Sequence, residues 1–212
     1  MENINREYDR LQQKYGSQEL TAVYGAGDMH SPRVALVFMN PTKRNIATAK
    51  DWLGLKAQWL GTKQVWEFLF KCGLIDEDIY LAIKSKKPNE WSCDFASAVY
   101  DNVTKNRVWI TNLAKCSQDD ARPLPDETFV EYRELLLCEL DYIRPEKIIL
   151  FGNQVSTIVL GENISVSQSR KKKYSLGIGD REYDCYAVYY PVGNGRFNQP
   201  KAIEDISYIL SK

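Results

Sequence analysis

The sequence predicts an α/β fold: a three-layer α/β/α sandwich around a central, mostly parallel four-stranded sheet. Four apolar, β-rich runs are nearly continuous instead of alternating, which is typical of strands that are covered on both faces. Segments with helical spacing lie between these runs, and this alternation favours parallel strands flanked by helices. The four runs are Arg33–Met39, Arg107–Leu113, Lys147–Phe151 and Cys185–Tyr190.

Three helices can be placed from apolar spacing and from signals at their ends. Thr62 is the expected N-cap of a helix over Lys63–Cys72, and Gly73 is the glycine expected to end it. A longer helix, Asp126–Ile143, carries apolar residues at helical spacing and stops before a proline. A third helix, Asn153–Leu160, begins directly after the glycine that follows the third strand.

Composition and charge narrow the class of protein. With 44% hydrophobic and 26% charged residues, the chain has the profile of a soluble globular protein. No run approaches the roughly 20 apolar residues of a membrane span, and the first residues are too polar for a signal peptide. We therefore expect a cytoplasmic protein with no membrane partner. The net charge is zero, so no overall field attracts a polyanion, although basic residues gather at Lys43-Arg44, Lys84–Lys87 and Arg170–Lys173.

Neither an internal repeat nor a linker-like tract interrupts the chain, so residues 1–212 are expected to form one domain and a monomer. The polar segment Asn163–Asp180 is interpreted as a mobile loop or hairpin. The five cysteines are odd in number, widely spread and without a CxxC pair, which argues against a disulfide framework and a metal cluster. The single histidine, His30, precedes the first strand, so catalysis by two histidines is excluded.

Polar turns follow three of the four predicted strands. The first strand stops at Asn40-Pro41-Thr42, because proline cannot donate a hydrogen bond to a sheet. The second ends at Asn112, and the last runs into Tyr190–Phe197, which includes two glycines. The carboxyl ends of parallel strands meet at one edge of a sheet, where open α/β folds bind their ligands. We therefore expect these three turns to converge on one site.

Taken in this order, the three turns resemble the motifs of the uracil-DNA glycosylase superfamily. Phe38-Met39-Asn40-Pro41 is similar to the first motif of its mismatch-specific and single-strand-selective branches. Trp109–Cys116, followed by Pro145–Gly152, is similar to the middle region of the iron–sulfur branches. Tyr190-Pro191-Val192 stands where the family has His-Pro-Ser, and Arg196 has the offset of the family's arginine.

The resemblance implies a DNA glycosylase that acts in base excision repair. Such a protein extrudes a damaged base from DNA and hydrolyses its N-glycosidic bond. Asn40 would orient the attacking water, Asn112 would read the edge of the base, and Trp59, or alternatively Trp52, would stack on it. Tyr190 would replace the catalytic histidine. Met39 and Pro41 would complete the base site. Arg196 or Phe197 would fill the gap that the extruded base leaves in the DNA stack. The implied DNA-binding residues are Thr42, Lys43, Arg44, Pro191, Gly193, Asn194, Gly195 and Arg196.

Departures from the family leave other functions open. No carboxylate accompanies Asn40, the usual histidine is Tyr190, and residues 1–33 lack the two cysteines that would complete an iron–sulfur cluster. No metal or organic cofactor is therefore expected. One alternative is an inactive glycosylase-fold module that binds nucleic acid or protein, and another is a hydrolase of free nucleosides or nucleotides. The two amides could also have purely structural roles: Asn40 would then cap its own turn, and Asn112 would bond to the backbone.

Overall fold

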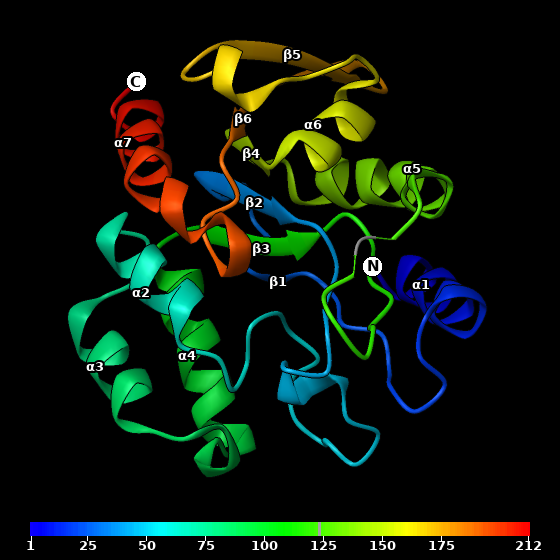
Figure 1. The fold of residues 1–212 in the computed structure, drawn as a ribbon, viewed down its shortest axis with the longest axis vertical. Coiled ribbons are helices and arrows are strands. Elements are labelled where there is room, and N and C mark those ends of the chain that lie inside the picture. The colour runs from blue at the N-terminus through cyan, green and yellow to red at the C-terminus, as the bar shows by residue number, and fades with distance from the viewer. Residues whose placement is uncertain (123) are drawn as a thin grey trace.

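Four parallel strands form the centre of the sheet in a computed structural model, which describes residues 1–122 and 124–212. They lie side by side in the order β3-β2-β4-β6, and each pair runs parallel (Figure 1). The strands are β2 (Val34–Phe38), β3 (Val108–Asn112), β4 (Lys147–Phe151) and β6 (Arg181–Val188). The predicted α/β class is confirmed.

The prediction of a four-stranded sheet is wrong, because the sheet has six strands with an antiparallel strand at each edge. β1 (Ala26–Gly27) pairs with β3, and β5 (Lys173–Ile178) pairs with β6. Neither edge strand is an apolar run: β1 has two residues, and β5 is mostly exposed. β5 and β6 form a hairpin that turns at Gly179, where φ is +59°, so the hairpin alternative for Asn163–Asp180 is confirmed over the second part of that segment.

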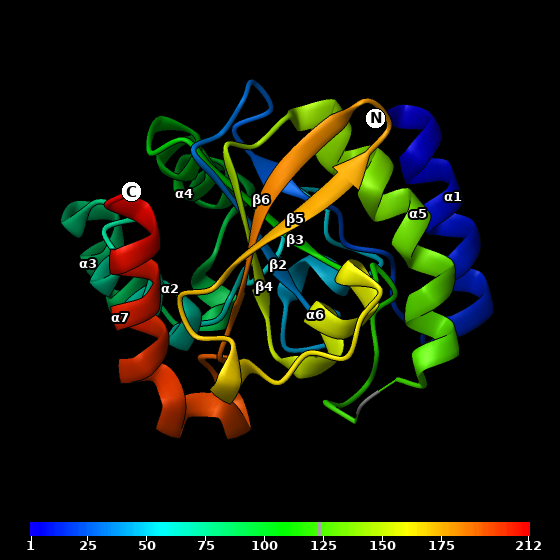
Figure 2. The same cartoon turned by 90° about the horizontal axis from the view of Figure 1, so that it is seen from above.

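Helices cover both faces of the sheet, and each face has its own apolar core (Figure 2). Along β2, the side chains of Leu36 and Phe38 enter one core while those of Ala35 and Val37 enter the other. No helix within the described residues is long and apolar enough to cross a membrane. The first face carries α2 (Gln64–Lys71), α3 (Glu77–Ser85), α4 (Cys93–Lys105) and α7 (Gln199–Leu210), and the second carries α1 (Glu2–Tyr15), α5 (Asp126–Ile143) and α6 (Asn153–Leu160).

The three predicted helices are confirmed, with α2 one residue shorter at each end. Gly73 follows α2 with φ of +65°, as expected for a glycine that ends a helix. Thr62 is not the N-cap, because its hydroxyl donates instead to the carbonyl oxygen of Trp59 at 2.6 Å. This bond fixes the loop before α2, which carries one of the predicted site residues.

Candidate functional site

The turns after β2 and β3 lie side by side at the carboxyl edge of the sheet. The backbone N–H of Leu113 donates to the carbonyl oxygen of Phe38 at 2.8 Å, and that of Gln118 donates to Pro41 at 3.1 Å. The Asn-Pro turn is therefore fastened to the segment that follows Asn112. β6 is parallel to these strands, so its final turn begins at the same edge (Figure 2).

An aromatic cluster connects the first and last turns. The ring of Phe38, at the end of β2, packs edge-to-face against Trp59 and Tyr190, with centroid distances of 5.1 and 6.1 Å. It also stacks on Phe151, at the end of β4, at 4.4 Å. Such contacts are worth about 0.5–1.5 kcal/mol each beyond the area that they bury. The structure therefore brings together two aromatic residues, Trp59 and Tyr190, that the sequence placed in one site.

Trp59 has an unusual backbone conformation. Its φ is +65°, which is costly for a large side chain and is most often found at functional sites. Its carbonyl oxygen accepts three hydrogen bonds, two from Thr62 and one from the indole of Trp66 at 3.0 Å, and these stabilise the strained loop. The indole Nε1 of Trp59 is buried and has no hydrogen-bond partner in the described part of the chain.

The amide of Asn112 is buried and has one unpartnered atom. Its Nδ2 donates to Oε1 of Gln58 at 2.9 Å, and Nε2 of Gln58 donates to the carbonyl oxygen of Val23 at 3.3 Å. Oδ1 of Asn112 is buried without a partner among the described residues. An unpaired buried acceptor costs roughly 1–3 kcal/mol, so a hydrogen-bond donor from a ligand or water would stabilise this atom.

The amide of Asn40 caps its own turn. Its Nδ2 donates to the carbonyl oxygen of Pro41 at 3.1 Å, as expected if Asn40 has a purely structural role in the turn. Its Oδ1 makes no hydrogen bond with any described residue, so this oxygen can still accept from a water. The hydroxyl of Tyr190 is protonated at neutral pH, as an ordinary phenol is, and burial raises its pKa further, so it can act as a hydrogen-bond donor.

Met39 lies apart from the aromatic cluster. Its side chain packs against the core beneath α1, α5 and α6, on the face of the sheet opposite to Phe38. The alternation of side chains along β2 accounts for this placement. Pro41 is buried in the turn itself and contributes its carbonyl oxygen to Asn40 and Gln118. Of the residues predicted for the base site, Trp59 and Asn112 have side chains on the face of Phe38.

The residues predicted to contact DNA are mostly exposed. Lys43, Arg44 and Arg196 form no ion pair within the described residues, so their charges are available to phosphates. Phe197, in the short helix η4 (Gly193–Asn198), is 96% exposed, an unusual position for a phenyl ring. Gly195 lets η4 approach the backbone of the preceding turn closely, since an added Cβ would lie 2.0 Å from a carbonyl oxygen. Thr42 is partly buried, Pro191 is buried, and Gly193 and Asn194 are exposed.

Two residues of the basic run Arg170–Lys173 pair with acidic residues of α7. Arg170 lies 2.8 Å from both Glu204 and the fully buried Asp205, and Lys171 pairs with Glu204. These hydrogen bonds lower the pKa of Glu204 to about 2. Arg170 and Lys171 therefore stabilise the packing of α7, whereas Lys173 pairs with Asp184 of β6.

A buried polar network beneath Asn112 was not predicted from the sequence. Lys115 donates to the carbonyl oxygen of Asn112, and its Nζ lies 2.9 Å from Oε2 of Glu139. Tyr8 and Trp109 donate to the same carboxylate at 2.8 and 2.9 Å. Burial lowers the pKa of Lys115, whereas burial raises the pKa of Glu139 but is outweighed by the lysine and the hydrogen bonds, which lower it. A lysine inside an otherwise apolar stretch is the one signal that pointed to this network.

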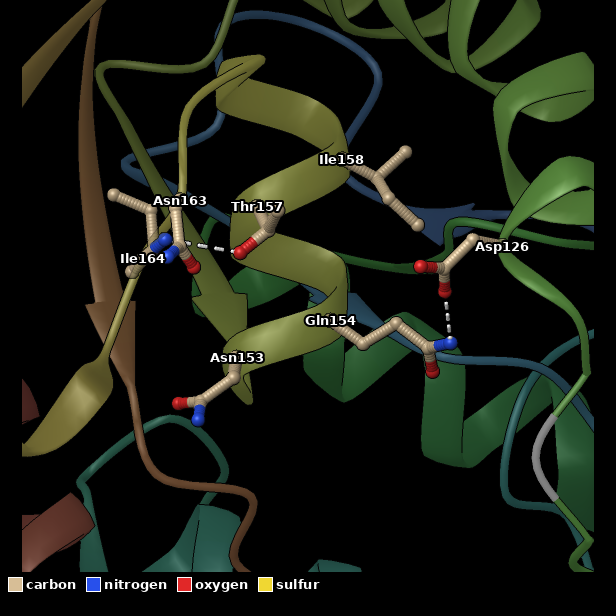
Figure 3. Close-up of a pocket in the computed structure, with 7 residues that line it drawn as sticks. All are labelled: Asp126, Asn153, Gln154, Thr157, Ile158, Asn163 and Ile164. Atoms are coloured by element: carbon tan, nitrogen blue, oxygen red, sulfur yellow. Dashed lines mark hydrogen bonds between the residues drawn. The ribbon is translucent and has the colours of Figure 1, made fainter.

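A cavity of about 330 Å³ lies beside α6, on the other face of the sheet (Figure 3). Its polar groups bond to one another: Gln154 donates to Asp126 at 2.6 Å, and the N–H of Ile164 donates to the hydroxyl of Thr157 at 3.0 Å. None of the residues that line this cavity has a buried side-chain polar atom without a hydrogen-bond partner among the described residues, in contrast to Nε1 of Trp59.

A second hollow of about 410 Å³ adjoins the loop after the Asn-Pro turn. It includes Lys43 and Trp52, the alternative stacking residue. The indole of Trp52 donates to the carbonyl oxygen of Leu55 at 3.0 Å, so its polar atom is satisfied within its own loop. Trp59, with its unpartnered indole and its contact to Phe38, is the better candidate for stacking on a base.

No three His, Cys, Asp or Glu side chains are grouped as metal ligands in the described ranges. Cys116 is a buried free thiol and Cys138 an exposed one. His30 precedes β2 and so lies toward the amino end of that strand, whereas the candidate site lies at its carboxyl end. No protein-family model matches the chain. Function must therefore be inferred from the residues and their geometry.

Proposed function

We propose that this protein is a uracil-DNA glycosylase-like protein that excises uracil, or another deaminated or modified base, from DNA. The observation that carries the proposal is the pair of buried, unpartnered polar atoms, Oδ1 of Asn112 and Nε1 of Trp59, near the ring of Phe38. A flipped base needs hydrogen-bonding groups on its edge and an aromatic surface against its plane. The order of the three turn motifs along the chain also supports this function.

In this proposal the N-glycosidic bond is broken by hydrolysis. The free oxygen of Asn40 orients a water toward C1′ of the sugar, the base leaves with the bonding electrons, and the water oxygen forms the new bond to carbon. The proton that this water loses passes through solvent to the departing base, which is released neutral. An amide is a poor general base, so the reaction is expected to be slow. The hydroxyl of Tyr190 donates a hydrogen bond to the departing base and stabilises its negative charge.

DNA would bind along the carboxyl edge of the sheet. Lys43, Arg44 and Arg196 are exposed there and would contact phosphates. The exposed ring of Phe197 would enter the stack that the flipped base leaves, since an apolar wedge stabilises an opened duplex.

An incision assay tests this function. Oligonucleotides carrying uracil, hypoxanthine or hydroxymethyluracil are incubated with the protein, and abasic sites are cleaved with alkali. We expect product from at least one substrate, and its loss in Asn40→Ala and Asn112→Ala. Asn163→Ala, an exposed amide beside the other cavity, is the matched control and should retain activity. Cleavage of free nucleosides alone would contradict a DNA substrate.

A nucleic-acid-binding module without catalysis is the second candidate. It is favoured by the hydrogen bond that Asn40 makes to its own turn. In addition, no carboxylate or imidazole bonds to the side chain of Asn40, Asn112 or Tyr190 among the described residues. Selective binding of uracil-containing DNA with no abasic product on any substrate would establish this candidate over the enzyme.

A further inference from the structure

We propose that Gln58 is a positioning residue that fixes the orientation of the Asn112 amide. It would thereby make the site selective for bases that present a ring N–H donor. The proposal rests on the proposed function and adds a class of ligand to it. Its basis is a chain of two side-chain hydrogen bonds that begins at the backbone of Val23 and ends at the free oxygen of Asn112.

The first bond determines the second. A backbone carbonyl only accepts hydrogen bonds, so the atom of Gln58 that faces Val23 at 3.3 Å must be the donor Nε2. The other end of the Gln58 amide is then the acceptor Oε1. Because Oε1 faces Asn112 at 2.9 Å, Asn112 must present its own donor, Nδ2, to Gln58. The remaining atom of Asn112, the acceptor Oδ1, is left free.

The surroundings prevent the chain of bonds from reversing. Gln58 and Asn112 are each 1% exposed, so bulk solvent does not compensate the lost hydrogen bonds of an amide that faces the wrong way. The backbone carbonyl of Gln58 accepts from the hydroxyl of Tyr100 at 2.8 Å, and the carbonyl of Asn112 accepts from Lys115. Both residues are therefore fixed at the backbone as well as at the side chain.

A fixed acceptor selects among bases. Uracil and hypoxanthine carry a hydrogen on a ring nitrogen of the pairing edge, and that N–H can donate to Oδ1 of Asn112. The corresponding ring nitrogen of cytosine or adenine is an acceptor, and it would face Oδ1 without a hydrogen between them. Leaving a buried acceptor unpaired lowers affinity by about 10- to 100-fold, so we expect a preference of that size for uracil over cytosine.

Gln58→Met removes the acceptor while keeping the length of the side chain. Binding is measured with single-stranded oligonucleotides that carry one 2′-fluorinated deoxyuridine or deoxycytidine, whose glycosidic bonds resist hydrolysis. The wild type should prefer the uracil oligonucleotide, and Gln58→Met should lose most of that preference. The variant should keep the wild-type affinity for an oligonucleotide of the same sequence that contains only undamaged bases and no thymine. Gln154→Met is the matched control: it makes the same substitution on the other face of the sheet, where Gln154 bonds to Asp126, and leaves the amide chain intact, so the preference should remain.

The two proposals fail in different ways. A wild-type preference for uracil that persists in Gln58→Met would overturn the role of Gln58 and leave the proposed function standing. No preference in the wild type would overturn the selective amide, and the incision assay then decides the proposed function separately. Should Gln58→Met not fold, hydrogen exchange of the Asn112 side chain in the free wild type decides by NMR. Slow exchange of one Nδ2 hydrogen supports the fixed amide, and fast exchange of both overturns it.

Discussion

The ammonium nitrogen of Lys115 lies 2.9 Å from a carboxylate oxygen of Glu139, and both side chains are fully buried. The pair joins the segment after β3 to α5 and holds the backbone of Asn112. Lys115→Met leaves the carboxylate buried without its counter-charge, which typically costs about 3–5 kcal/mol. We expect a loss of that size in the free energy of unfolding, measured by urea denaturation at neutral pH.

Lys71→Met is the matched control for this measurement. Lys71 pairs with Glu67 at 2.8 Å on the exposed surface of α2, where an ion pair contributes no more than about 1 kcal/mol. The double variant Lys115→Met/Glu139→Gln removes both charges and should be more stable than Lys115→Met alone. A Lys115→Met protein as stable as Lys71→Met would show that the buried pair does not stabilise this region.

Asp76 should make stability depend on pH in the acid range. Hydrogen bonds from Lys105, Asn106 and Asn102 lower the pKa of its carboxyl to about 2, from an ordinary value near 3.8. A lowered pKa in the folded state stabilises the fold above the ordinary value, and this contribution is lost as the pH falls from about 4 to about 2. Thermal melts should therefore show Asp76→Asn below the wild type at pH 6 and the difference shrinking toward pH 2. Asp101→Asn, an exposed aspartate of α4, should show no such trend.

Strands that are buried along their whole length could be predicted from the sequence. Features that form through contacts between residues distant in the chain could not be predicted in the same detail. β4 has the predicted bounds because its apolar run is covered on both faces. The segment that contains β5 was predicted only as a loop or hairpin, without strand bounds, because a partly exposed edge strand lacks that pattern and forms through pairing with β6. Asn112 was predicted as a site residue from its position at a strand end. Gln58 was not, because its role comes from Asn112 and Val23, which are distant in the chain.

The salt dependence of DNA binding should distinguish the two basic surfaces. Lys43 and Arg44 are exposed and unpaired within the described residues, so replacing both with alanine should reduce the slope of log affinity against log salt by about 1.5. Arg170→Ala leaves the buried Asp205 without its partner and should lower stability while leaving the slope unchanged. Fluorescence anisotropy across a salt series, with melting curves, measures both effects. An altered slope in Arg170→Ala would place its run on the DNA-binding surface.

Phe197 should affect binding to duplex DNA without affecting stability. Its ring is 96% exposed, so Phe197→Ala removes almost no packing and should change the free energy of unfolding by less than about 0.5 kcal/mol. In a duplex, a flipped base leaves a gap in the stack that the ring can fill, whereas a single strand has no such gap. We therefore expect weaker binding and slower excision with uracil-containing duplexes, and little change with single strands. Val130→Ala, an exposed apolar residue of α5, is the control. An equal loss on both substrates would mean that Phe197 contacts the strand itself and does not act as a wedge.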